Sequence, residues 1–330
     1  MSCVRECKPS SRCRAGSSKG LAHALRGRRG IALVGVLWAL VLLSVMAGSF
    51  VRETRTEVVV ARNTVENAKA RALADAGIHR AVLTMSEADF EDRWRADGRP
   101  YLWRFADGEV RISVQDEAGK IDLNEAPVIL LSGLFEAVGV DPERAQGLAD
   151  AVADYRDGND LRRLYGAEDD DYRDAGYAHG AKDGPFEVIA ELAQVFGMTA
   201  EIYERVAPFV TLYTQADTIE PLVAPRPVLL ALPGITPEEV DGYIAERAAA
   251  ETETDLELVT IPSLDNAADF ISLGERDFVY SLRAEARTPE GGVFVREAVV
   301  VPGDGRSGAF AVLRWGQGRR SATPGADETN

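Results

Sequence analysis

Cysteine, histidine and catalytic motifs are scarce in this chain of 330 residues, and their scarcity excludes several classes of protein. All three cysteines lie within the first 14 residues, so disulfides, thiolate zinc sites and thiol catalysis are excluded from the rest of the chain. The histidines, His23, His79 and His179, are isolated from one another, and no GxSxG, HExxH or Walker pattern occurs. The sequence therefore predicts a protein that is not an enzyme.

Positive charge is scarce beyond the N-terminus. The formal net charge is −16, yet residues 1–30 hold eight basic residues and one acidic residue. The remaining 300 residues therefore have a net charge of −23. Because an acidic surface repels phosphate backbones, we expect no nucleic acid among the partners.

The segment 31–51 has no charged residue at all, and its 21 residues are long enough to cross a bilayer as a helix. Arg26, Arg28 and Arg29 precede it, and the positive-inside rule places that end in the cytoplasm. We therefore expect a single-pass membrane protein with its C-terminal part outside the cytoplasm. If the host is Gram-negative, the membrane is the inner membrane and that part lies in the periplasm.

Three interpretations of this segment remain open. Ala47-Gly48-Ser49 is compatible with a secretory signal peptide cleaved after the apolar run, and a plain membrane anchor is equally compatible with the length. The third interpretation uses the basic leader that ends at Gly30, directly before Ile31. This arrangement resembles the class III signal of type IV pilins and pseudopilins. The resemblance implies that prepilin peptidase cleaves between Gly30 and Ile31 and that Ile31 becomes the N-methylated terminus.

Proline is absent between Ile31 and Pro100, and Gly77 is the only glycine from Phe50 to Asp97. Small apolar residues recur at spacings of three and four after the membrane segment, which is typical of an amphipathic helix. These residues are Val58, Ala61, Val65, Ala68 and Ala72. The pattern predicts one continuous helix from Ile31 to about Met85.

Strands are predicted on both sides of a helical region, so the expected fold class is α+β. Two alternating runs in 101–116 flank Asp107-Gly108 and predict a hairpin, and three further strands are predicted at 278–287, 293–301 and 309–315. The intervening sequence predicts helices at 126–138, 141–156, 187–196, 200–206, 226–232 and 237–250.

Acidic residues and glycines crowd into the segment 154–186. Oxygen-rich side chains on a loop are the ligands that Ca²⁺ prefers. Asp157, Asn159 and Glu168 match positions one, three and twelve of an EF-hand, but Leu161 and Arg162 at positions five and six exclude a true EF-hand. The alternative is a solvated acidic loop whose charge is offset by arginines. The candidate ligands of a structural Ca²⁺ ion are Asp154, Asp157, Asn159, Glu168 and Asp171.

The same segment carries a family resemblance. The motifs at 154–159 and 166–169, the run 185–211 and the earlier 116–124 are similar in order and spacing to those of the general secretion pathway protein K family. Members of that family are minor pseudopilins of the type II secretion system. The resemblance implies a pseudopilin fold, in which a long N-terminal helix lies on an antiparallel sheet, with a large inserted α-helical domain.

The implied organisation follows the chain. It comprises a basic leader (1–30), the transmembrane half of the helix (31–51), the pseudopilin helix and first strands (52–122), an inserted helical domain (123–275) with an acidic loop (154–186) and a helix-turn-helix (226–250), the C-terminal strands (276–316) and a disordered tail (317–330).

The resemblance also implies function and partners. We expect the chain to cap or initiate the periplasmic pseudopilus at its tip and to support export of folded proteins across the outer membrane. Other minor pseudopilins, the major pseudopilin, prepilin peptidase and the inner-membrane assembly platform are the expected partners, and Ca²⁺ is the expected ion. Gly35 stands at the fifth mature position, where most pilins have glutamate, and this difference favours a tip position.

A second functional hypothesis comes from Leu232-Pro233-Gly234-Ile235, which resembles the hairpin of helix-hairpin-helix modules. It predicts a membrane-anchored DNA-binding protein of a DNA uptake system. Glu238 and Glu239 follow directly, however, and a phosphate-binding hairpin needs basic residues there. The segment 303–308 fits GxGxxG but lies between two predicted strands, so we interpret it as a loop.

Overall fold

The structure is a computed structural model that describes residues 29–85, 87, 93–250, 252–259, 267–272, 278–303 and 310–320. The chain divides into two units, Met1–Arg62 and Asn63–Asn330. The leader up to residue 28, the tail from residue 321 and the loop 304–309 lie outside the described residues.

Helix α1 (Arg29–Met85) confirms the prediction of one long helix. In the first unit, Ala32–Phe50 has a mean hydropathy of 2.3 and none of it is buried, so it is long and apolar enough to cross a membrane. In the second unit, Ala70, Ala74, Ile78 and Ala81 are fully buried. Their spacing of three to four residues places them on one face of the helix, against the sheet.

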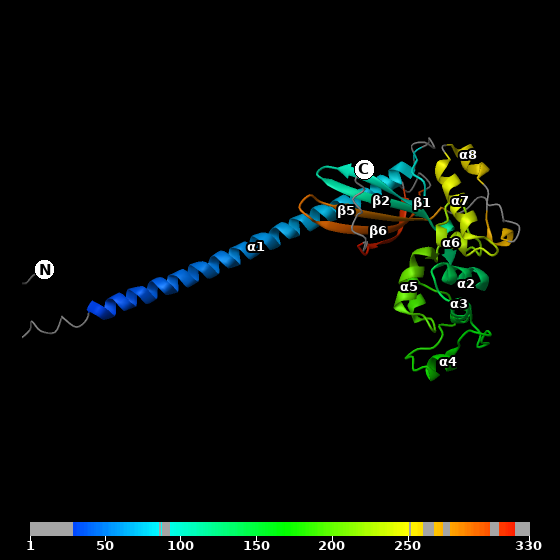
Figure 1. Ribbon diagram of the computed structural model, residues 1–330, viewed down its shortest axis with the longest axis horizontal. Coiled ribbons are helices and arrows are strands. Elements are labelled where there is room, and N and C mark those ends of the chain that lie inside the picture. The colour runs from blue at the N-terminus through cyan, green and yellow to red at the C-terminus, as the bar shows by residue number, and fades with distance from the viewer. Residues whose placement is uncertain are drawn as a thin grey trace, which may run out of the picture. The chain divides into compact units, whose positions relative to one another are not determined.

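Five antiparallel strands form that sheet, in the order β1-β2-β5-β6-β7 (Figure 1). On β2, Val110, Ile112 and Val114 face α1 and are fully buried, whereas the residues between them face away. Gly77 brings the helix close to the sheet, because a Cβ atom there would lie 2.9 Å from Cγ1 of Val110. The strands are β1 (Asp97–Phe105), β2 (Gly108–Asp116), β5 (Tyr280–Arg287), β6 (Val293–Pro302) and β7 (Phe310–Gln317).

The segment between β2 and β5 is mainly helical and has a hydrophobic core of its own, separate from the core between α1 and the sheet. We call this segment, residues 117–279, the helical insert. Asp116 and Tyr280 are paired opposite each other, so the insert begins and ends at one end of the sheet (Figure 1). Its helices are α2 (Val128–Ala137), α3 (Pro142–Arg156), α4 (Asp169–Asp174), α5 (Ala200–Val206), α6 (Arg226–Leu230), α7 (Pro237–Ala249) and α8 (Glu253–Leu258).

Four local predictions were wrong. The hairpin turn is Ala106-Asp107, because Gly108 already pairs with Phe105 in the ladder, and Leu73 packs where a Cβ atom of residue 108 would be. The predicted helix 187–196 is a 3₁₀ helix, η2 (Ile189–Gln194), since Val188 is extended. Helix α6 ends at Leu230, shortly before Pro233, because proline disfavours helix in the residue before it. The disordered tail was predicted to begin at residue 317, which is too early. Strand β7 includes Gln317, and the Gly318 N–H donates to the Val295 carbonyl.

Other elements were missed. Helices α4 and α8 and the two-residue parallel pair β3 (Ile121–Asp122) and β4 (Val210–Thr211) lie in segments that the sequence left unassigned. Each is at most six residues long, too short for a period to be recognised.

Candidate functional site

The acidic segment is built from the end of α3 and the start of α4. Asp154 lies in the last turn of α3, and Asp157 is its C-cap. Glu168 is the N-cap of α4, and Asp171 is in its first turn. The loop between the two helices therefore brings four of the five predicted ligands to two helix ends.

Asp154 and Asp157 share one cationic partner. Nη1 of Arg163 lies 2.6 Å from Oδ1 of Asp154 and 2.6 Å from Oδ2 of Asp157. The Arg163 N–H also donates to Oδ2 of Asp154 at 3.1 Å. Asp154 is completely buried, and burial raises its pKa despite these bonds. The guanidinium thus occupies the position between two carboxylates that a bound cation would need.

Asn159 is turned toward Asp157. Its Nδ2 group donates to Oδ1 of Asp157 at 2.6 Å, and its Oδ1 accepts from the Leu161 N–H at 3.0 Å. Asp171 points to different partners, since Oδ1 accepts from Arg162 at 2.9 Å and Oδ2 accepts from the Glu168 N–H at 3.0 Å. Asp171 therefore caps α4, and its carboxylate is already satisfied without a metal ion.

Glu168 is a buried carboxylate of this segment with one unpartnered oxygen. It is 92% buried, and its Oε1 atom has no hydrogen-bond partner among the described residues. Burial, followed by the negative charges of Asp154 and Asp157, raises its pKa to about 7. Asp160 and Asp183 add to this field. These two acids were not among the predicted ligands, although both lie in the same acidic stretch of sequence.

The fit to Ca²⁺ is therefore partial. Glu168, Asp154 and Asp157 supply oxygens of the type that Ca²⁺ prefers, and the unpartnered Oε1 of Glu168 fits a cation. No group of three or more histidine, cysteine or acidic side chains is arranged around a common metal position in the described part of the chain. Binding would require Arg163, whose side chain is 39% exposed, to move aside.

The predicted cleavage site and the helical hairpin complete the set of candidate sites. Gly30 and Ile31 have helical backbone, and their side chains are outside the described part of the chain. In the hairpin, Gly234 has φ of +79°, which the turn between α6 and α7 requires. Arg226 at the start of α6 is paired with Asp241 at 2.6 Å. The helix end that would face phosphate has Glu238 and Glu239 in its first turn, so the hairpin does not favour DNA binding.

Comparison with known proteins gives consistent similarities. Residues 112–215 match the family described as type II secretion system (T2SS), protein K. The chain is 27% identical to type II secretion system protein K of Klebsiella pneumoniae, over 69% of this chain and 82% of that protein. It is 24% identical to the protein of the same name from Pseudomonas aeruginosa, over 67% of this chain and 73% of that protein.

The fold is also similar to a solved structure. The crystal structure of the GspK-GspI-GspJ complex from the enterotoxigenic Escherichia coli type 2 secretion system contains a chain with a TM-score of 0.52 and 19% identity. The match covers 81% of this chain and all of that one, so the two chains share a similar fold over that part.

Proposed function

This chain belongs to the type II secretion system protein K family, and from that premise we infer that it is a minor pseudopilin of that system. The observation that carries this function is the position of the helical insert. Residues 63–85 of α1 run along the sheet from the β5–β6 turn, where Gly292 lies against the Glu66 carbonyl, to the end at which the insert begins. The insert thus extends the end of the sheet toward which the helix points.

We propose that this position makes the chain a tip subunit. In a fibre built by stacking of N-terminal helices, a subunit added above this one would meet the helical insert. The insert would therefore cap the periplasmic pseudopilus or start its assembly, in support of the export of folded proteins across the outer membrane. Other minor pseudopilins and the major pseudopilin are the proposed partners, and the presence of GspI and GspJ in the similar solved complex supports this choice. A structural rather than a catalytic role is part of the proposal.

The proposal includes membrane location and processing. Ala32–Phe50 would span the inner membrane, and the body of the chain would lie in the periplasm. Prepilin peptidase, acting with the inner-membrane assembly platform, would remove residues 1–30 and leave Ile31 as the methylated N-terminus. Mass measurement of the purified chain should give a start at Ile31, and Gly30→Glu should block maturation. A start near Ser49 would contradict the pseudopilin assignment.

A structural Ca²⁺ ion is a further part of the proposal. It would be held by Glu168 with Asp154 and Asp157, close to Asn159, and would neutralise carboxylates that α3 and α4 bring together. The buried, unpartnered oxygen of Glu168 supports it. Asp171 is the weakest of the predicted ligands, because its two oxygens are engaged by Arg162 and by the α4 backbone.

Deletion of the gene tests the function. Secretion of substrates of the type II system into the medium should stop, and the substrates should accumulate folded in the periplasm. Expression of the full chain should restore secretion, and a chain that lacks residues 117–279 should not. Normal secretion in the deletion strain would contradict the proposed function.

A further inference from the structure

The helical insert is covalently tied to the sheet at two adjacent points. It leaves the sheet after Asp116 and returns at Tyr280, and these residues face each other on neighbouring strands. The two chain connections, at Asp116 and at Tyr280, define an axis about which the insert can rotate relative to the sheet. The orientation of the insert therefore depends on contacts that lie away from this axis, and one set of them is made by Arg95, just before β1.

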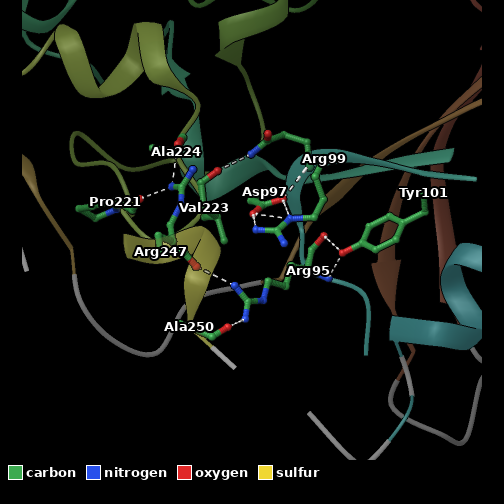
Figure 2. Close-up of polar contacts among 10 residues, drawn as sticks. Arg95, Asp97, Arg99, Tyr101, Pro221, Val223, Ala224, Arg247 and Ala250 are labelled. Carbon is green, nitrogen blue, oxygen red and sulfur yellow. Dashed lines mark hydrogen bonds and ion pairs between the residues drawn. The ribbon is translucent and has the colours of Figure 1, made fainter. Parts of the chain in front are cut away.

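Arg95, just before β1, reaches the end of α7. Its guanidinium donates to the carbonyl oxygen of Arg247 at 2.7 Å and to the carbonyl oxygen of Ala250 (Figure 2). These carbonyl oxygens belong to the last turn and the C-cap of α7, where the helix supplies no N–H donor to them, and they carry the negative end of its dipole. Arg95 is held in turn by Tyr101, whose hydroxyl accepts from the Arg95 N–H at 2.7 Å.

Arg247 continues the connection into the insert. It is 95% buried, and its Nη1 group donates to the carbonyl oxygens of Pro221 at 2.7 Å and Ala224 at 2.9 Å (Figure 2). Nε2 of Gln115 on β2 donates to the Val223 carbonyl in the same segment at 2.8 Å. The segment 221–224 is thus bound both by α7 and by the sheet.

Asp97 balances the positive charge at this junction. Oδ2 of Asp97 lies 2.6 Å from Nη2 of Arg99 (Figure 2), and the charge of Arg247 also acts on this carboxylate. Burial opposes ionisation of Asp97, but the bonds from Arg99 and the charges of Arg99 and Arg247 outweigh it and lower its pKa. Two guanidinium groups, those of Arg99 and Arg247, therefore stabilise the charged form of Asp97.

We propose that Arg95, Asp97, Arg99 and Arg247 form a latch that holds the helical insert in one orientation against β1. Without the latch, the insert would swing about the two connections at Asp116 and Tyr280. The contacts between Arg95 and the insert are hydrogen bonds to backbone carbonyls, and Arg95 belongs to neither hydrophobic core. Opening the latch at Arg95 should therefore change the orientation of the insert and leave both folded parts intact.

Pulsed electron paramagnetic resonance on the full-length chain in detergent tests the latch. The three native cysteines lie in the leader, so they are replaced by serine, and spin labels are attached through Asp107→Cys on the β1–β2 turn and Ala245→Cys on α7. Arg95→Met should broaden the distance distribution. Arg95→Lys should broaden it less, because one ammonium group replaces the fork that reaches two carbonyls. The matched control is Arg104→Met, an exposed arginine of β1 that pairs with Glu109 and should leave the distribution narrow.

Each outcome decides the proposal. A broad distribution for Arg95→Met, with unchanged helix content and an unchanged control, supports the latch. A narrow distribution for both Arg95→Met and Asp97→Asn overturns it. Equal broadening in Arg104→Met would also overturn it, because the effect would then not be specific to the contact with α7.

A second experiment measures secretion, and it rests on the proposed function. If assembly of the tip needs the latched orientation, Arg95→Met should lower secretion while the chain remains in the membrane at its normal level. Normal secretion by a variant with a broadened distribution would show that assembly does not need the latch. That result differs from failure of the proposed function, in which the deletion strain itself would secrete normally.

Discussion

At the scale of single residues, an arginine of the acidic segment neutralises part of its negative charge. Arg163 bridges Asp154 and Asp157, so these two carboxylates are compensated without a metal ion. Glu168 is different, because its buried Oε1 has no partner among the described residues and faces other negative charges. The consequences of a bound ion should therefore be largest at Glu168.

The first prediction concerns Glu168 in the absence of metal. Its pKa is raised from 4.5 to about 7 on folding, so the folded state binds the proton more tightly than the unfolded state does. The free energy of unfolding should then fall as pH rises from about 4.5 to about 7. Thermal unfolding in EDTA should show this fall for the wild type, and Glu168→Gln should reduce it and raise the melting temperature above pH 7. An identical pH profile for the two proteins would contradict the prediction.

The second prediction concerns Ca²⁺ itself. Binding to the folded state alone would stabilise it by about 2.7 kcal/mol at a hundredfold excess over the dissociation constant. The full chain should melt at a higher temperature in Ca²⁺ than in EDTA, with a smaller effect of Mg²⁺. Asp157→Ala and Glu168→Ala should each remove most of the difference.

The control for calcium is Asp170→Asn, in the same helix as Asp171. The Asp170 side chain is 87% exposed and is paired with Arg173, so this variant should keep the full response. Equal melting temperatures of the wild type in saturating Ca²⁺ and in EDTA would leave the segment as a surface compensated by its arginines.

At the scale of elements, the seam between α1 and the sheet determines how the second unit is held together. Small residues at positions 70, 74, 77 and 81 let the helix approach β2 and β5 closely. Ile78 lies on the same face of the helix and is also fully buried. A partly buried ion pair also joins the helix to the sheet, because Nε of Arg296 on β6 lies 2.5 Å from Oδ1 of Asp75 on the helix.

The third prediction tests this seam. Ile78→Ala removes buried carbon atoms and leaves a cavity between the helix and the sheet. It should therefore lower the free energy of unfolding by about 2–5 kcal/mol. The control is Val65→Ala on the same helix, where the side chain is 53% exposed and the expected change is within about 0.5 kcal/mol. Urea unfolding followed by tryptophan fluorescence measures both. Equal effects of the two substitutions would mean that α1 is not packed as described.

At the scale of the whole molecule, the chain combines one apolar helix with a sheet and a bulky insert at one end of that sheet. This combination supports the proposed tip position, in which a subunit is used once in each fibre. Among the described residues, none outside the neighbouring backbone of α1 lies within 4 Å of a Cβ atom placed at Gly35. Glycine is thus not required at position 35 by packing within the chain.

The fourth prediction follows from this role. Quantitative mass spectrometry of isolated fibres should find the chain at very low copy relative to the major pseudopilin. Gly35→Glu should be tolerated by the fold and should not improve secretion, since a tip subunit has no neighbour above it whose N-terminal amine needs a counter-charge. Incorporation along the whole fibre in equal numbers with the major pseudopilin would rule out a tip position.

The sequence alone determined the features that arise from local periodicity and local chemistry. The long helix, the three C-terminal strands, α5 and the Asp141 N-cap of α3 were predicted within a few residues, because each depends on apolar spacing or on a capping side chain next to the helix. The acidic segment was also identified, since its composition is local.

Only the tertiary structure decided which side chains meet. Arg163 lies between Asp154 and Asp157 because the loop after α3 folds back, and Glu168 has a raised pKa because packing buries it. Gly108 is a strand residue because it pairs with Phe105, and Leu73 of α1 packs against it. Arg95 and Arg247 are 152 residues apart in the chain, and no local pattern records that contact. Hydrogen bonds and burial depend on distance in space, whereas periodicity records only the neighbours along the chain.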